Sequence, residues 1–112
     1  MSATYVDGLI GKLTPRETGP RADKALTTDT AKVVVFEFAA GQELSDHAAR
    51  HPVIIAVLSG HATLRADGVD YDLRPGCLVH LTEMMRHEVL AHEDTTLTVT
   101  MLLPTPISSA AN

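Results

Sequence analysis

The chain contains a single cysteine, and this scarcity excludes two kinds of site. Cys77 has no second thiol with which to form an intramolecular disulfide, and no CxxC pair exists for a structural zinc ion or a thioredoxin-like redox centre. The N-terminus lacks a basic segment followed by a long apolar stretch, and no run approaches the roughly 18 apolar residues of a membrane span. We therefore expect a cytoplasmic protein that is neither secreted nor anchored in a membrane.

Tryptophan and clusters of basic residues are absent as well. With no Trp and 45% hydrophobic residues, burial depends mostly on Val, Ile, Leu and Ala, a composition that suits β-strands. The net charge of -5 and the absence of any Lys/Arg cluster leave no electrostatic footprint for a phosphate backbone or an anionic membrane. Neither nucleic acid nor a membrane is an expected partner.

The length of 112 residues predicts one domain, and the texture of the chain divides it into three parts. Residues 1–31 mix Gly, Pro, Thr and charged residues, and we expect them to form an arm that packs on the domain. Residues 32–104 hold short β-branched and apolar runs separated by turn residues such as the Asp67-Gly68 pair, which indicates about seven or eight strands. We expect residues 105–112 to form a C-terminal tail. The pattern predicts an all-β barrel or sandwich.

Two glycine-to-histidine spacings stand out in the predicted strand region. In the first block Gly41 precedes His47 by six positions and Gly60 closes the block, and in the second Gly76 is followed by His87. These blocks resemble the two motifs of the cupin superfamily, in particular its small single-domain RmlC-like bacterial members. The resemblance implies a double-stranded β-helix, the jelly-roll barrel of that family, over residues 32–104.

The resemblance also implies a metal site, but the residues of this chain depart from it. Cupins hold Fe, Mn, Ni, Cu or Zn with three His and one carboxylate, and here Ala49 and Val53 replace the second His and the Glu. In the second motif Thr82, Met84 and Ala91 replace Pro, Gly and Asn. Only His47 and His87 match ligand positions, and two neutral imidazoles alone are expected to bind a divalent ion weakly and exchangeably.

Two further histidines are candidates to complete a metal site. His51 has the same parity as His47 along an extended chain, although Pro52 and the bend expected there leave its direction open. His80 shares a strand face with Leu78 and Thr82 and precedes the corner that leads to His87, so it either points into the barrel mouth or is a partly buried strand histidine that bonds to the backbone. His61 and His92 lie in turn-rich stretches, and we expect them to face solvent.

Four more residues are candidates to line the pocket. Val53 takes the position of the absent Glu, and Glu83 lies in the corner that overlooks the barrel mouth in cupins, where it supplies a carboxylate or is simply a solvated loop charge. Met85 and Met101 can line an apolar cavity because thioethers adapt to irregular space, although core packing explains them equally well. We expect Cys77 to be a small buried apolar residue.

The sequence leaves two classes of function open, and no catalytic residue can be assigned. One is a metal-dependent cupin enzyme, a dioxygenase or an isomerase acting on a small organic substrate, in which His47 and His87 hold the ion with one or both of His51 and His80. The other is a metal-free cupin that binds or senses a small molecule in the same barrel. In either case the resemblance implies a homodimer formed through the sheet edge or the outer sheet face. We therefore expect a small cupin-domain protein that binds a divalent metal, a small molecule or both through His47 and His87.

Overall fold

The computed structural model describes residues 1–104, so the predicted tail of residues 105–112 lies outside them. The described residues contain nine strands and no helix, which confirms the predicted all-β class. No helix in this part of the chain has the length and apolar character needed to cross a bilayer. The strands are β1 (Arg21–Thr27), β2 (Ala31–Phe38), β3 (Glu43–Ala48), β4 (Val53–Ser59), β5 (Ala62–Ala66), β6 (Val69–Leu73), β7 (Leu78–Leu81), β8 (Arg86–Ala91) and β9 (Thr95–Leu102).

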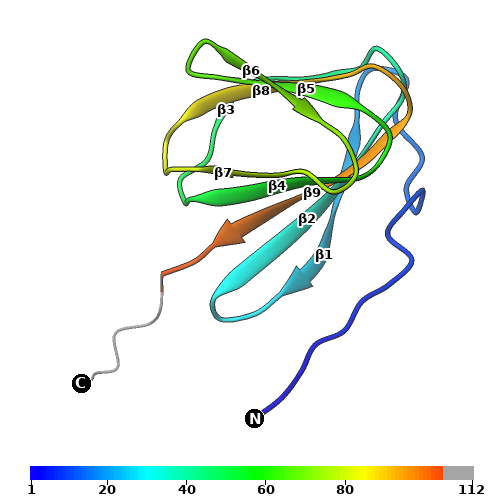
Figure 1. Ribbon diagram of the computed structural model, residues 1–112. Helices are drawn as coiled ribbons and strands as arrows, with labels where there is room; N and C mark the ends of the chain where they lie inside the picture. Colours follow the sequence, from blue (N-terminus) through cyan, green and yellow to red (C-terminus); the bar gives the residue numbers. More distant parts are fainter. Residues whose placement is uncertain (105–112) are drawn as a thin grey trace.

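The strands form two antiparallel sheets that lie face to face (Figure 1). The larger sheet has the order β1-β2-β9-β4-β7, and the smaller has the order β3-β8-β5-β6. Several neighbours within a sheet are far apart in sequence, such as β2 beside β9 and β3 beside β8. This arrangement brings the two histidine motifs, one on β3 and the other on β8, to adjacent strands.

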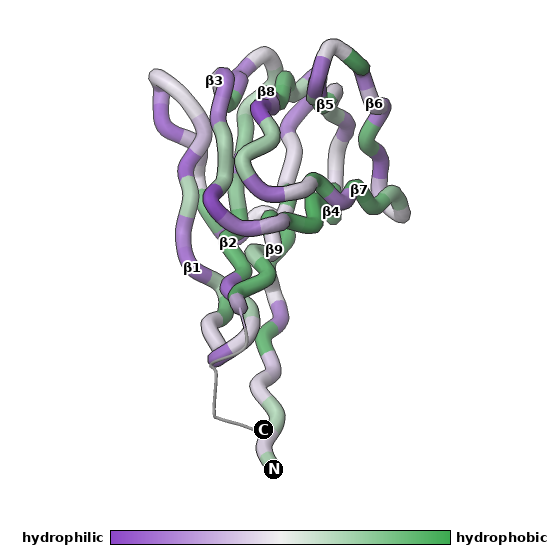
Figure 2. The backbone as a smooth tube through the Cα atoms, turned by 90° about the vertical axis from the view of Figure 1, so that its left-hand side faces the viewer, coloured by the Kyte–Doolittle hydropathy of each residue, from purple (hydrophilic) through white to green (hydrophobic). Residues whose placement is uncertain are grey.

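The core fills the space between the two sheets. Strand β4 is apolar on both faces in sequence, yet Val53, Ile55 and Val57 are buried while the residues between them are only half-buried. The alternation fixes Val53, Ile55 and Val57 as the inner face, because successive side chains of a strand point to opposite sides. Figure 2 shows the apolar character concentrated along β2, β4 and β9. The buried cluster also includes Phe38, Ala62, Leu64, Ala66, Leu73, Leu81, Val89, Ala91 and Leu97.

A tight turn joins β5 to β6, as the sequence predicted. Ala66 pairs with Val69, and the two residues between them, Asp67 and Gly68, have φ angles of 51° and 75°. Two consecutive positive φ values are the mark of the hairpin turns that Asp-Gly favours. The predicted hairpin is therefore confirmed.

Residues 1–31 include a strand that the sequence analysis did not predict. β1 pairs antiparallel with β2 along its whole length and forms one edge of the larger sheet. Nearer the N-terminus, the N–H of Gly11 donates to Thr96 Oγ1 (3.1 Å), and the Thr96 hydroxyl donates to the buried carboxylate of Glu37 (2.5 Å). The arm thus lies against the outer side of the larger sheet and shields a polar pair there.

The outer faces of the two sheets differ in charge. On the smaller sheet the outward positions carry the ion pairs Arg65–Asp70 and Arg86–Asp46. On the larger sheet the outward side chains of β9, β4 and β7 include no Asp, Glu, Lys or Arg, and we call this area the uncharged face. Its residues are Ile54, Ala56, Leu78, His80, Thr98 and Thr100.

Candidate functional site

A β-bulge in β3 places His47 on the inner face of the smaller sheet. Leu44 pairs with Val89 and His47 pairs with His87, so three steps along β3 correspond to two along β8. In a regular strand, residues three apart face opposite sides, whereas the extra residue in a bulge restores both to one side. Leu44 and His47 therefore face inward together, and the histidines of the two sequence motifs lie directly opposite each other.

His87 is buried and its ring is oriented by the backbone. Only 4% of the residue is exposed, and its Nδ1 lies 3.0 Å from the carbonyl oxygen of Met85. A carbonyl accepts only, so Nδ1 carries the proton and donates this hydrogen bond. In the neutral ring Nε2 is then a free lone pair, available to a hydrogen-bond donor or to a metal ion.

His47 contacts His87 edge to face at the solvent boundary. The two ring centroids lie 5.4 Å apart with an interplanar angle of 83°. His47 itself is exposed, so the pair spans from the protein interior to the surface. Neutral imidazoles in this arrangement supply both donors and acceptors to one small region.

An ion pair on the outer side of the same two strands flanks the histidines. Arg86 donates from Nε and Nη2 to the two carboxylate oxygens of Asp46, at 3.0 and 2.5 Å. The hydrogen bonds from Arg86 hold the pKa of Asp46 below its usual value of 3.8. Both side chains are largely exposed, so the pair orders the surface of β3 and β8 without entering the cavity.

The two histidines line a small cavity between the sheets. Its volume is about 70 Å³, and every other side chain that lines it is apolar. Because pockets for drug-sized ligands span roughly 300 to 1,000 Å³, this cavity accepts only a small group. The apolar lining consists of Val34, Phe36, Leu44, Ala49, Val99 and Met101.

Of these apolar residues, only Met101 was predicted from the sequence as a pocket residue. Some of the others were detectable, because Val34 and Phe36 follow the two-residue period of one face of β2, and Val99 lies two residues from Met101 on β9. Leu44 was hidden, since its inward direction depends on the bulge that also turns His47 inward.

The structure does not bring His51 and His80 to the cavity. β3 ends at Ala48, and the chain bends at residues 50 and 51. The alternation of side chains along a strand therefore stops before His51, which does not face the same side as His47. His51 is half-buried just before β4. His80 is exposed and pairs with Ile54, on the outer side of β7, because the next residue, Leu81, is buried in the core.

The remaining predicted pocket residues also lie outside the cavity. Val53 is 1% exposed and belongs to the core cluster, against which Met85 packs. Glu83 is exposed in the loop between β7 and β8, where it lines a shallow surface depression with Met85 and Arg86. Cys77, expected to be buried, is half-buried in the turn before β7.

The loop before His87 has a strained backbone residue. Met84 has a φ of 62°, which lies in the left-handed region. It is the third residue of a four-residue turn, in which the N–H of Met85 donates to the carbonyl oxygen of Thr82 (3.4 Å). Cupins have Gly at this position of the second motif, and Gly adopts such a φ without strain. The Met84 N–H donates to Ala49 O (2.7 Å), a bond that ties this loop to the end of β3 and holds both histidine-bearing strands together.

The side chains present do not fit the metal site of a cupin. Two imidazoles can share one ion, but the positions of the second His and the Glu of the first motif hold Ala49 and Val53, an apolar wall residue and a core residue. Over residues 1–104 no group of three or more His, Cys, Asp or Glu side chains is arranged to hold a metal ion. Water would have to complete the coordination against apolar walls that offer it no hydrogen bonds.

Comparisons with known proteins agree with this fold. Three crystal structures illustrate the likeness. An RmlC-like cupin protein from Desulfovibrio desulfuricans has a TM-score of 0.80 at 23% identity, with 89% of this chain and 97% of that chain covered. A conserved protein with a double-stranded β-helix domain from Klebsiella pneumoniae has a TM-score of 0.78 at 20% identity, with 93% of each chain covered. A cupin superfamily protein from Desulfitobacterium hafniense has a TM-score of 0.77 at 17% identity, with 93% and 95% covered.

These similarities confirm the predicted double-stranded β-helix and concern the fold alone. No curated protein sequence matches the chain. The family model for the cupin domain matches residues 34–103, which is more than half of the 112 residues and includes both histidine motifs. This chain therefore belongs to the cupin domain family.

Proposed function

We propose that this cupin binds a small organic molecule at the His47–His87 pair and needs no resident metal to do so. The observation that carries the proposal is the composition of the cavity. Of the lining residues in the described part of the chain, two are histidines and the other six are apolar. Small-molecule sites typically combine apolar walls with a few polar groups that fix the orientation of the ligand.

The hydrogen bond at His87 indicates what the ligand offers. Because Nδ1 donates to Met85 O, the neutral ring presents Nε2 as an acceptor. The complementary ligand has an O–H or N–H donor beside a short apolar group that fills about 70 Å³. Any larger portion extends past the exposed His47 into solvent.

The metal-dependent enzyme is the weaker alternative. Its chemistry requires ligands that the cavity lacks, since two of the four cupin ligand positions are apolar here. Burying a hydrated ion against Val34, Phe36 and Val99 would leave its water ligands without partners. The same walls favour the apolar portion of an organic ligand.

The test combines elemental analysis with ligand binding. The purified protein is expected to hold no stoichiometric Fe, Mn, Ni, Cu or Zn, and NMR screening with small alcohols and phenols is expected to shift the His47 and His87 imidazole resonances. His87→Ala should abolish binding. His80→Ala is the matched control, because that imidazole is exposed on the opposite face of the larger sheet and should not affect binding.

One result would refute the proposal and favour the enzyme. It is a stoichiometric transition metal that survives dialysis, leaves with a chelator and is absent from the His47→Ala, His87→Ala double variant. Alcohol or phenol binding that persists in the double variant would also refute it, since the ligand would then lie elsewhere.

A further inference from the structure

We propose that the ligand of the His47–His87 cavity is a small organic acid, whose carboxylate is bound by Lys24 and Lys32 beside the mouth of the cavity. This inference rests on the proposed function and adds to it the charge of the ligand. The donor group and the apolar portion of the ligand lie in the cavity, and the carboxylate lies outside it. Both lysines reach this position through strand pairing, which joins β1, β2 and β9.

Strand register places Lys32 on the cavity side of the larger sheet. Val34 lines the cavity, and Lys32 precedes it by two residues on β2, so both side chains point to the same side. Lys32 also pairs with Met101 of β9, which lines the cavity as well. Because Lys32 is half-buried, its aliphatic stem continues the apolar wall, while its ammonium group reaches solvent.

Lys24 lies on the same side of the sheet, on the edge strand β1. It pairs directly with Val34, and residues that pair across two strands point to the same side. The irregularity in β1 falls between Lys24 and Leu26, after this pair. The neighbouring Asp23 points to the opposite side, where its carboxylate accepts a hydrogen bond from the Lys24 main-chain N–H (2.9 Å). Two ammonium groups therefore flank the wall that Val34 forms.

The smaller sheet leaves this part of the larger sheet uncovered. The cavity lies between β2 and β9 of the larger sheet and β3 and β8 of the smaller one, and β3 is an edge strand. β1 adds a further strand next to β2, and Figure 1 shows the β1–β2 hairpin extending beyond the smaller sheet. A ligand that leaves the cavity beside the exposed His47 therefore meets the open strip that carries the two lysines.

Neither lysine has a counterion within residues 1–104. The ion pairs in this part of the chain use the carboxylates of Asp46, Asp70 and Asp72, with arginine or histidine as the partner. A partly buried ammonium group without a counterion is dehydrated without compensation. A ligand carboxylate supplies that compensation. Its hydrogen bonds to Lys24 and Lys32 are charge-assisted, which makes them stronger than hydrogen bonds between neutral groups.

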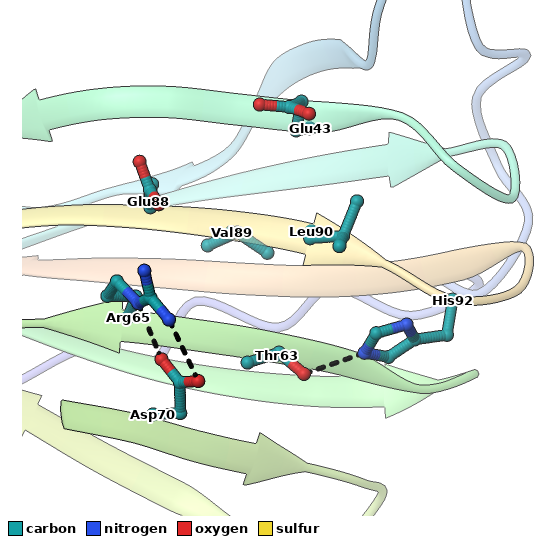
Figure 3. A pocket seen from close by; sticks show the side chains of 8 residues that line it. All are labelled: Glu43, Thr63, Arg65, Asp70, Glu88, Val89, Leu90 and His92. Carbon is teal, nitrogen blue, oxygen red and sulfur yellow. Dashed lines mark hydrogen bonds and ion pairs between the residues drawn. The ribbon is translucent and has the colours of Figure 1, made fainter.

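A larger pocket on the outer face of the smaller sheet has the opposite charge (Figure 3). Its volume is about 360 Å³, and it contains Glu43, Glu88 and the Arg65–Asp70 ion pair. Three carboxylates against one guanidinium leave this pocket negative, so it repels an organic acid. The distribution of charge therefore favours the lysine side of the molecule for an anionic ligand.

Calorimetric titration with two hydroxy acids, 4-hydroxybutyrate and 4-hydroxyphenylacetate, and with their uncharged amides tests the inference. The acids are expected to bind about tenfold more tightly than the amides, and this difference should shrink as the salt concentration rises. Lys24→Gln and Lys32→Gln should each weaken acid binding and together remove the difference, whereas amide binding should not change. Lys12→Gln is the matched control, because it removes the same charge from the arm on the outer side of the larger sheet.

The amides distinguish failure of this inference from failure of the proposed function. The inference alone is overturned if neither acid binds more tightly than its amide, or if the double variant Lys24→Gln, Lys32→Gln binds the acids as the parent does. Acid binding that persists in the His47→Ala, His87→Ala double variant also overturns it, since the lysines would then act without the cavity. Amides that shift neither imidazole resonance, together with a negative alcohol and phenol screen, would overturn the proposed function as well.

Discussion

At the scale of single residues, Gly60 has the least room for a side chain among the glycines. Its φ is +101°, and a Cβ built on it would lie 2.4 Å from the carbonyl oxygen of Asp94 and 2.7 Å from Thr95 Cα. The Thr95 hydroxyl in turn bonds to the main chain of His61 in both directions, because it accepts from the His61 N–H and donates to the His61 carbonyl. The glycine therefore permits the close approach of two chain segments at the end of the sandwich.

We expect Gly60→Ala to destabilise the fold by roughly 2 to 4 kcal/mol, from backbone strain and from the overlap of Cβ with backbone atoms. Gly76→Ala is the matched control, since Gly76 has nearly the same φ, +100°, but nothing within 4 Å of its Cβ position. This substitution should lower the free energy of unfolding by about 1 kcal/mol, because it introduces backbone strain without the overlap. Urea denaturation of both variants measures the difference, and equal losses would show that the close contact at Gly60 carries no cost.

At the scale of elements, the β3–β8 pair carries the candidate site on its inner side and an ion pair on its outer side. The bulge turns Leu44 and His47 to the same side, while Asp46 and Arg86 face solvent and bridge the two strands. The ion pair is exposed and so contributes little to stability in water. Its measurable signature is the lowered pKa of Asp46.

Arg86→Gln should raise the pKa of Asp46 toward 3.8, because the hydrogen bonds that lower it are lost. A carboxyl group whose pKa is lowered by folding adds stability above its unfolded value, and this stability is lost as the pH falls through the folded value. The variant should therefore differ from the parent above pH 3.8 and converge with it in stronger acid. Carbon-13 NMR titration of the Asp46 carboxyl measures this change in pKa. Arg65→Gln is the control, because it removes the partner of Asp70 and should leave the pKa of Asp46 unchanged.

Most elements of the fold could be predicted from the sequence, and the exceptions share a physical cause. The runs at residues 32–38 and 53–58 are dense in apolar and β-branched residues and became β2 and β4. β1 and β3 did not show this pattern, because β1 is a charged edge strand and β3 is polar and bulged. Their pairing comes from neighbours distant in sequence, which a local pattern does not contain.

At the scale of the whole molecule, the two outer sheet faces predict how copies of the chain associate. A chain of net charge -5 repels its own copies, and the uncharged face is the area of the larger sheet where that repulsion is smallest. Leu78 is 74% exposed at its edge, unusual for so large an apolar side chain. We expect two copies to meet there as a homodimer.

Leu78→Glu should convert that dimer to a monomer, because two like charges would be buried in a symmetric interface. Leu90→Glu is the control. Leu90 is 40% exposed on the outer face of the smaller sheet and should leave the dimer intact. Sedimentation velocity distinguishes the two states. A parent protein that is monomeric at every concentration, or a Leu78→Glu variant that remains dimeric, would contradict the expectation.

The candidate site could be predicted only in part. His47 and His87 were identified because the spacing of each from its motif glycine is a local property of the chain. The sequence alone does not distinguish His51 and His80 from these two ligand candidates. The direction of the His51 side chain depends on the bend after β3, and that of His80 depends on which face of β7 is buried. His61 and His92 were expected to face solvent. His92 is exposed, whereas His61 is half-buried beside Asp72, a partner that the sequence does not reveal because it depends on the pairing of β5 with β6.

The origin of the cavity lining in two different sheets has a consequence for selectivity. His47, His87 and Leu44 belong to the smaller sheet, where strand register fixes the polar contacts, whereas Val34, Phe36, Val99 and Met101 belong to the larger one. Small sliding of one sheet over the other alters the shape of the apolar wall and leaves the spacing of the imidazoles unchanged. Such a site would be strict toward the polar end of its ligands and tolerant toward the rest, so related compounds that share one donor group could compete for it.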